Sequence, residues 1–229
     1  LGSLGTGLLT PHIEPLLARL RMLLDREDMP VDAVEKRIRI QQVNARAYEP
    51  EYFSPIATAV LQRRRIVIDH HNRQRNETIR REVSPQRLNY YRENWYLDAW
   101  CHLRNELRSF GLDAIKGVWL GTEAAQDVAE DDLVAVLDSG YGIFGGKDVQ
   151  WAELEFSPSR AQWVSKETWH PQQEGHFTAG GSYRLRIPFS NPTELTMDVM
   201  RHLPEVRVLS PASLREQVRV ILHKTLEQV

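Results

Sequence analysis

The fold is decided by residues 65–115, which read RIVIDHHNRQRNETIRREVSPQRLNYYRENWYLDAWCHLRNELRSFGLDAI. Short runs rich in β-branched and aromatic residues alternate here with clusters of Asn, Arg, Ser and Pro that favour turns. We expect five strands, and these lie at residues 65–70, 78–83, 87–92, 95–102 and 106–112. Strands this short, about 8–12 residues apart, are typical of a small antiparallel β-barrel.

The segments that flank this stretch have a different periodicity. Apolar residues recur at helical spacing over residues 11–24 and 54–62, and a short strand is expected at 34–43. Ser54 caps the second helix and Pro55 occupies its first turn. The amino-terminal part of the chain is therefore predicted to be mainly helical.

The carboxy-terminal part mixes helices and strands. An acidic helix is expected at residues 122–137, and Gly140, Gly142, Gly145 and Gly146 are expected to form a flexible hinge after it. Beyond the hinge, strands are expected at 150–156, 183–189 and 206–209, and helices at 159–167, 192–202 and 212–228, the last of which is long. Alternating elements of this kind predict an α+β domain.

Composition excludes several classes of protein. The chain has 229 residues, of which 41% are hydrophobic and 26% are charged, as in ordinary globular domains. No apolar run approaches the roughly 20 residues that span a bilayer, and no secretion signal is recognisable. The single cysteine, Cys101, excludes an internal disulfide and any zinc site with several cysteines. These features favour a cytoplasmic protein, and the start at Leu1 without a methionine suggests part of a longer chain.

Charge is distributed unevenly although the formal net charge is only −2. Nine arginines fall within one short stretch, namely Arg63, Arg64, Arg65, Arg73, Arg75, Arg80, Arg81, Arg87 and Arg92. Residues 123–138 are correspondingly acidic. A near-neutral total therefore leaves room for an anionic partner bound at a local basic patch.

A series of motifs in order along the chain resembles the WYL-domain family of bacterial transcriptional regulators. The tripeptide that names the family stands here as Trp95, Tyr96 and Leu97. The other landmarks are Ser84-Pro85, Leu88, Ala99-Trp100-Cys101, Leu107-Arg108-Ser109-Phe110 and Leu112-Asp113. The segments GIFGG (142–146), AELEFSP (152–158) and LSPASLR (209–215) resemble the extension that commonly follows such domains. The resemblance covers roughly residues 63–229.

The resemblance implies a fold and a division into domains. It implies an SH3/Sm-like antiparallel barrel with helices before it, followed by a ferredoxin-like α+β domain. The expected parts are a helical linker or dimerisation segment at 1–62, the WYL domain at 63–121, a connecting helix and hinge at 122–148, and the extension at 149–229. A winged helix-turn-helix that reads operator DNA is expected to lie outside these residues.

The resemblance also implies a function and a site. Family members act as homodimers whose barrel binds a single-stranded nucleic acid or a nucleotide and signals to the DNA-binding part. The ligand-binding residues carried over to this chain are His71, Arg73, Arg81, Ser84, Tyr96, Arg104 and Arg108. Gly111 and Ala114 stand where many members have arginine, and His70 replaces a more frequent tyrosine. No cofactor is expected.

Elementary chemistry agrees with this site in part. Guanidinium groups bind phosphate oxygens through two parallel hydrogen bonds, and aromatic rings stack on bases. Because side chains alternate along a strand, Tyr96 faces away from Trp95 and Leu97, and only one of Arg80 and Arg81 can face a ligand. Trp95 and Leu97 are therefore expected in the core, and Cys101 is expected to be buried.

Other functions are less well supported by the residues. His70 and His71 could supply two ligands of a metal site, but no carboxylates or cysteines at a familiar spacing supply the others. Ser84 has no nucleophile-elbow setting, and GIFGG matches neither dinucleotide nor phosphate-loop spacing, so no enzyme is predicted. The alternative to a ligand sensor is a protein–protein module, in which the barrel and the extension dimerise or dock on a partner. The ligand, the operator and the direction of regulation stay open.

Overall fold

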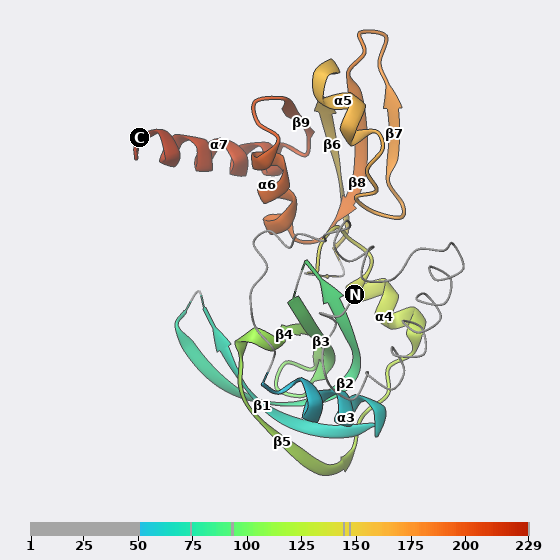
Figure 1. Ribbon diagram of the computed structural model, residues 1–229, viewed down its shortest axis with the longest axis vertical. Helices are drawn as coiled ribbons and strands as arrows, with labels where there is room; N and C mark the ends of the chain where they lie inside the picture. Colours follow the sequence, from blue (N-terminus) through green and yellow to red (C-terminus); the bar gives the residue numbers. More distant parts are fainter. Residues whose placement is uncertain (1–50, 74, 93, 144, 147, 229) are drawn as a thin grey trace, which may run out of the picture. The chain divides into compact units, whose positions relative to one another are not determined.

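A computed structural model describes residues 51–73, 75–92, 94–143, 145–146 and 148–228, and its elements are labelled in Figure 1. The helix expected at 11–24 and the strand expected at 34–43 lie outside this range. The chain divides into two compact units, which meet in sequence near residues 127–128. None of the described helices combines the length and the apolarity that crossing a bilayer requires.

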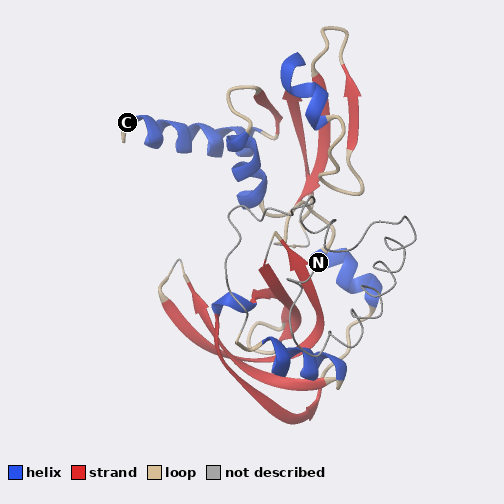
Figure 2. Cartoon of the chain, in the orientation of Figure 1, coloured by secondary structure: helices blue, strands red, loops and turns tan. Residues whose placement is uncertain are grey.

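The first unit is a five-stranded antiparallel sheet that follows a short helix (Figure 2). The helix is α3 (Phe53–Leu61), and the strands are β1 (Arg64–Asn72), β2 (Glu77–Tyr91), β3 (Asn94–Cys101), β4 (Glu106–Gly111) and β5 (Ile115–Ala124). A single 3-10 turn, η1 (Leu112–Ala114), joins the last two strands. The strand order β4-β3-β2-β1-β5 returns the last strand to the side of the first. It confirms the SH3/Sm-like fold class.

Two of the five predicted strand positions were wrong in detail. Residues 78–83 and 87–92 form one long strand, β2, because a register shift between Pro85 and Arg87 lets it continue past the proline as a bulge. The last strand of the sheet, β5, is not among the five predicted strands, and its end at residues 122–124 falls within the predicted acidic helix. That helix, α4 (Glu130–Leu137), is only 8 residues long.

The second unit has the βαββαβ order of a ferredoxin-like fold, with one more helix at its end. Its elements are β6 (Gln150–Phe156), α5 (Pro158–Val164), β7 (Glu174–Phe177), β8 (Tyr183–Phe189), α6 (Pro192–Arg201), β9 (Val206–Ser210) and α7 (Ala212–Leu226). The strands form one antiparallel sheet in the order β7-β8-β6-β9. This arrangement confirms the α+β extension, although β7 had not been predicted.

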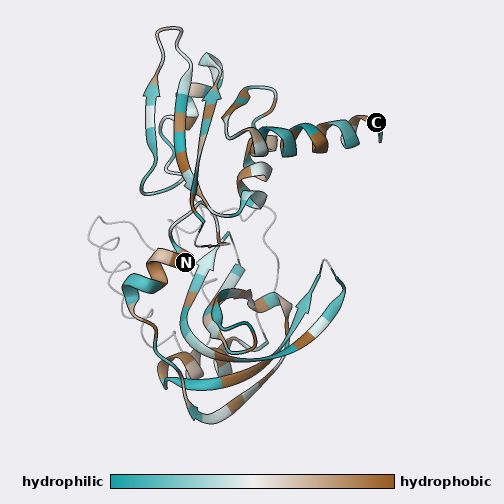
Figure 3. Ribbon diagram, turned by 180° about the vertical axis from the view of Figure 1, so that it is seen from behind, coloured by the Kyte–Doolittle hydropathy of each residue, from teal (hydrophilic) through white to brown (hydrophobic). Residues whose placement is uncertain are grey.

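Each unit has its own hydrophobic core, and the strands alternate between hydrophobic and hydrophilic side chains (Figure 3). In the first unit, the core side of the sheet carries Ile66, Ile68, Val83 and Leu97, all fully buried. We call this side the core face of the barrel and the opposite side its outer face. Leu97 is therefore in the core as predicted, and Trp95 packs against it from a partly buried position.

The glycine-rich segment after α4 packs on the second unit. The N–H of Tyr141 donates to Pro188 O at 2.8 Å, and the buried Tyr141 hydroxyl donates to Asp198 at 2.6 Å. Gly142 has φ +94°, and a Cβ there would lie 2.9 Å from Cδ of Glu194. Gly142 thus allows close approach of the backbone to Glu194 on α6.

Candidate functional site

Strand pairing places Arg80 and Arg81 on opposite faces of the barrel. Arg81 pairs with Ile68 across β1 and β2, and Arg80 pairs with Asp69. Residues directly opposite each other in an antiparallel pair share a face. Arg81 therefore lies on the core face and is only 7% exposed. Its guanidinium Nη1 donates to Sγ of Cys101 at 3.7 Å, so Cys101 is buried as predicted.

The charge of Arg81 has no carboxylate partner among the residues that the structure describes. The nearby pair of Arg87 and Asp98 shows the usual alternative. There the buried Asp98, 1% exposed, accepts from Nε of Arg87 at 2.9 Å. A buried cation without a counter-ion is costly, because its desolvation is not offset by Coulomb attraction. The core face therefore favours an anion beside Arg81.

Arg80 on the outer face is fully engaged within the chain. Its Nε and Nη2 donate to the two carboxylate oxygens of Asp69 at 2.8 and 3.0 Å. This hydrogen bonding lowers the pKa of Asp69. The guanidinium also lies 4.5 Å from the ring centroid of Trp119, whose Cη2 would be 2.5 Å from a Cβ at Gly117. Arg80 therefore lies over the ring of Trp119, which stays 47% exposed.

The two adjacent histidines point to opposite faces. His70 packs edge-on against Phe110 with ring centroids 5.2 Å apart. His71 lies on the outer face, where its Nδ1 is 3.2 Å from Oγ1 of Thr78. No group of three potential metal ligands occurs in the described part of the chain. Because Arg81 lies on the core face and His71 on the outer face, the sheet separates them.

Arg73 and Tyr96 come together around Gly111. Nη2 of Arg73 donates to Oδ2 of Asp113 at 2.8 Å. A Cβ at Gly111 would lie 2.8 Å from Oδ1 of Asp113 and 3.6 Å from Cε1 of Tyr96. The absence of a side chain at Gly111, where many family members have arginine, therefore leaves room for Asp113 to hold Arg73 beside the half-buried Tyr96.

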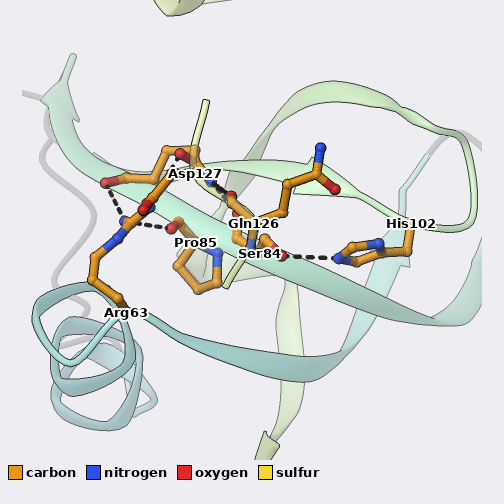
Figure 4. A network of polar contacts seen from close by, with 7 residues as sticks. Arg63, Ser84, Pro85, His102, Gln126 and Asp127 are labelled. Atoms are coloured by element: carbon orange, nitrogen blue, oxygen red, sulfur yellow. Dashed lines mark hydrogen bonds and ion pairs between the residues drawn. The ribbon is translucent and has the colours of Figure 1, made fainter. Parts of the chain in front are cut away.

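Ser84 is fully buried and joins a polar network that the sequence did not suggest (Figure 4). Its Oγ lies 2.9 Å from Nε2 of His102 and accepts the N–H of Gln126, also at 2.9 Å. A hydroxyl beside an imidazole resembles an activated nucleophile. At 0% exposure, however, this serine cannot meet a substrate.

Arg104 and Arg108 are exposed on the β3–β4 hairpin. Alternation along β4 puts Arg108 on the same side of the strand as Phe110, a core residue. The seven predicted site residues thus occupy several separate places and not one face. Arg81 is in the core, Ser84 is in the network of Figure 4, Arg73 and Tyr96 surround Gly111, and His71 is on the outer face.

Sequence reasoning missed the groups that contact these residues. The sequence predicts that Cys101 is buried but not that it contacts Arg81; it indicates His102 only as part of a strand and Asp113 only as a family landmark. The burial of Arg81 could have been predicted from alternation along the strand. Arg81 is two residues from both Ile79 and Val83, so its side chain lies on the apolar side of the strand. No comparable signal indicated Gln126, because its contact with Ser84 spans 42 positions.

Comparison with known proteins agrees with this architecture. The WYL domain family matches residues 51–120, and the WCX domain family matches residues 148–226. Protein PafC of Mycobacterium tuberculosis, strains CDC 1551 and H37Rv, is 25% identical over 224 residues, covering 93% of this chain and 69% of PafC.

Two solved structures also align. They are proteasome accessory factor B/C (PafBC) of Arthrobacter aurescens, with 23% identity and a TM-score of 0.38, and a CRISPR Cas-related protein, with 12% identity and a TM-score of 0.45. The alignments cover 81% and 76% of this chain. They span only 28% of the first structure and 49% of the second. The two domain matches decide the classification: the chain belongs to the WYL-domain family of regulators and carries a WCX domain after its WYL domain.

Proposed function

We propose that this chain is the ligand-sensing region of a DNA-binding transcriptional regulator, and that its barrel binds the phosphate groups of a nucleotide or of single-stranded nucleic acid. The observation that carries the proposal is Arg81, a guanidinium only 7% exposed with no carboxylate partner in the described chain. A phosphate beside it would supply the missing counter-charge through two parallel hydrogen bonds.

Further residues support a polyanionic ligand over a single small anion. Arg104 and Arg108 add exposed positive charge on the β3–β4 hairpin. The half-buried ring of Tyr96 offers an aromatic face, and base–aromatic stacking contributes about 1–3 kcal/mol per base. Under this proposal Arg81 binds one phosphate, and the hairpin arginines contact its neighbours. His71 and Ser84 are not among the proposed ligand contacts, because they are bonded to Thr78 and to Gln126.

The rest of the proposal concerns the whole protein. It acts in the cytoplasm as a homodimer, and a winged helix-turn-helix preceding these residues reads the operator. The WYL domain, residues 63–121, senses the ligand, and the extension, residues 149–229, contributes to assembly. The family membership of the chain and the position of Arg81 support this division of labour.

Titration of short, labelled single-stranded DNA and RNA at two salt concentrations tests the proposal. Affinity is expected to fall as salt rises, because phosphate contacts release counter-ions. Arg81→Met should weaken binding by roughly tenfold or more, the loss expected for a charge-assisted hydrogen bond. Arg80→Met is the matched control, since Arg80 lies on the outer face and is bonded to Asp69. Binding that Arg81→Met does not weaken, or no binding, would contradict the proposal.

A further inference from the structure

The chain that leaves the first unit after β5 is held by side chains of β1 and β2. The N–H of Gln126 donates to Oγ of Ser84, and the Ala125 N–H donates to Arg63 O at 2.9 Å. Arg63 also forms an ion pair with Asp127 and donates to Pro85 O at 2.8 Å. Figure 4 draws the contacts of Arg63 with Pro85 and Asp127 and of Ser84 with Gln126. Together with the Ala125 bond they hold the path of residues 125–127.

The bulge in β2 supplies another contact. The register shift between Pro85 and Arg87 leaves Gln86 out of the ladder, and bulges commonly redirect a side chain in this way. Nε2 of Gln86 donates to Ser84 O at 2.9 Å and to Gln126 O at 2.7 Å. Both backbone groups of Gln126 are therefore bonded to β2.

The other side of this network leads to Arg81. His102, which contacts Ser84 through Nε2, directly follows Cys101, which accepts from Arg81. The N–H of His102 donates to Glu82 O at 3.1 Å, so the end of β3 stays paired with β2. Cys101 therefore contacts Arg81 on the core face, and the next residue, His102, contacts Ser84 on the outer face.

We infer that His102 and Ser84 couple the occupancy of the Arg81 site to the path of the chain leaving the barrel. This inference rests on the proposed function, because it takes the anion at Arg81 as the signal. An anion that binds the guanidinium competes with Cys101 Sγ for its N–H groups. Release of Cys101 shifts the end of β3, and His102 then pulls on the Ser84–Gln126 bond. Both residues are positioning residues that never touch the ligand.

Amide exchange at Gln126, measured by NMR on the full chain, tests the coupling without ligand. Ser84→Ala removes the acceptor and is expected to speed exchange roughly fivefold, the factor that corresponds to one ordinary hydrogen bond. Arg81→Met breaks the contact with Cys101 and is expected to change exchange at Gln126 in the same direction. Arg80→Met, one residue away on the opposite face, should leave it unchanged. A single cooperative urea transition with an unchanged slope shows that each variant is folded, whatever its midpoint.

The second part adds a short 5′-phosphorylated oligothymidylate. It should alter exchange at Gln126 in the wild type. Ser84→Ala should show no response at Gln126 and should bind up to about fivefold more tightly, because binding then no longer works against that hydrogen bond. A response preserved in Ser84→Ala, or an unchanged Gln126 in Arg81→Met, overturns the coupling. Failure of the wild type to bind the oligothymidylate overturns the proposed function instead. The coupling is then decided by amide exchange at Gln126 in ligand-free Arg81→Met and Arg80→Met.

Discussion

Replacing Arg81 by methionine is expected to stabilise the barrel when no anion is present. The side chain is 7% exposed, and within the described part of the chain it donates one weak hydrogen bond, to Cys101 Sγ. The desolvation cost of a buried ion is several kcal/mol, and a hydrophobic residue of similar volume removes that cost. Methionine has nearly the same length and can pack against Ile68 and Val83. We expect the free energy of unfolding to rise by about 1–3 kcal/mol.

Arg87→Met is the contrasting substitution, because Arg87 donates to the carboxylate of the buried Asp98 at 2.9 Å. Its loss leaves that carboxylate without this cation and should cost about 3 kcal/mol, the lower end of the range for broken buried pairs. Because Arg87 is partly exposed, the expected loss of stability lies at the lower end of that range.

Urea unfolding followed by tryptophan fluorescence measures both effects, and urea keeps the ionic strength low. Adding an oligonucleotide at about a hundred times its Kd should stabilise the wild type by about 2.7 kcal/mol and Arg81→Met by much less. The reasoning is refuted if Arg81→Met loses as much stability as Arg87→Met. Such a result would mean that Arg81 is already compensated.

Two further predictions concern the second unit. Gly142→Ala should lower the free energy of unfolding in urea by about 1–3 kcal/mol, because φ is +94° and the new Cβ would meet the Glu194 carboxylate. Gly180→Ala is the control: with open space around Gly180, it should change the free energy of unfolding by less than about 0.5 kcal/mol. Burial, and after it the positive charge of Arg160, lower the pKa of His202. Just below about pH 6.5, His202 is therefore protonated in the unfolded chain and still neutral in the folded chain. The stability difference between wild type and His202→Phe should therefore shift against the wild type as the pH falls from about 6.5, and a pH-independent difference would contradict this.

Much of the fold could be predicted because local patterns agree with it. Ser54 and Pro55 placed the second helix within one residue of α3, Phe53–Leu61. Alternation around Ile66 and Ile68 predicted β1. The misses have physical causes. Pro85 reads as a turn, yet a bulge absorbs it inside β2. In β5, two glycines and Glu123 conceal a strand that forms because it pairs with β1.

The site was predicted less well because face and partner depend on distant strands. Alternation separated Arg80 from Arg81 but did not say what either would contact. Asp69, which binds Arg80, is 11 positions away, and Cys101, which binds Arg81, is 20 away. Ser84 kept its family position but proved to be fully buried, bonded to Gln126. Its value for function lies in that network and not in ligand contact.

The density of arginines, which first suggested an anionic partner, turns out to be a weak argument. Most of these arginines have carboxylate partners on neighbouring strands or turns: Arg63 with Asp127, Arg65 with Glu82 and Glu123, Arg73 with Asp113, Arg80 with Asp69, and Arg87 with Asp98. Pairs of this kind offset the field that a count of charges implies. Arg81 differs from them because it is buried and has no carboxylate partner among the residues that the structure describes. The case for an anion therefore depends on that one guanidinium, and a single substitution is enough to test it.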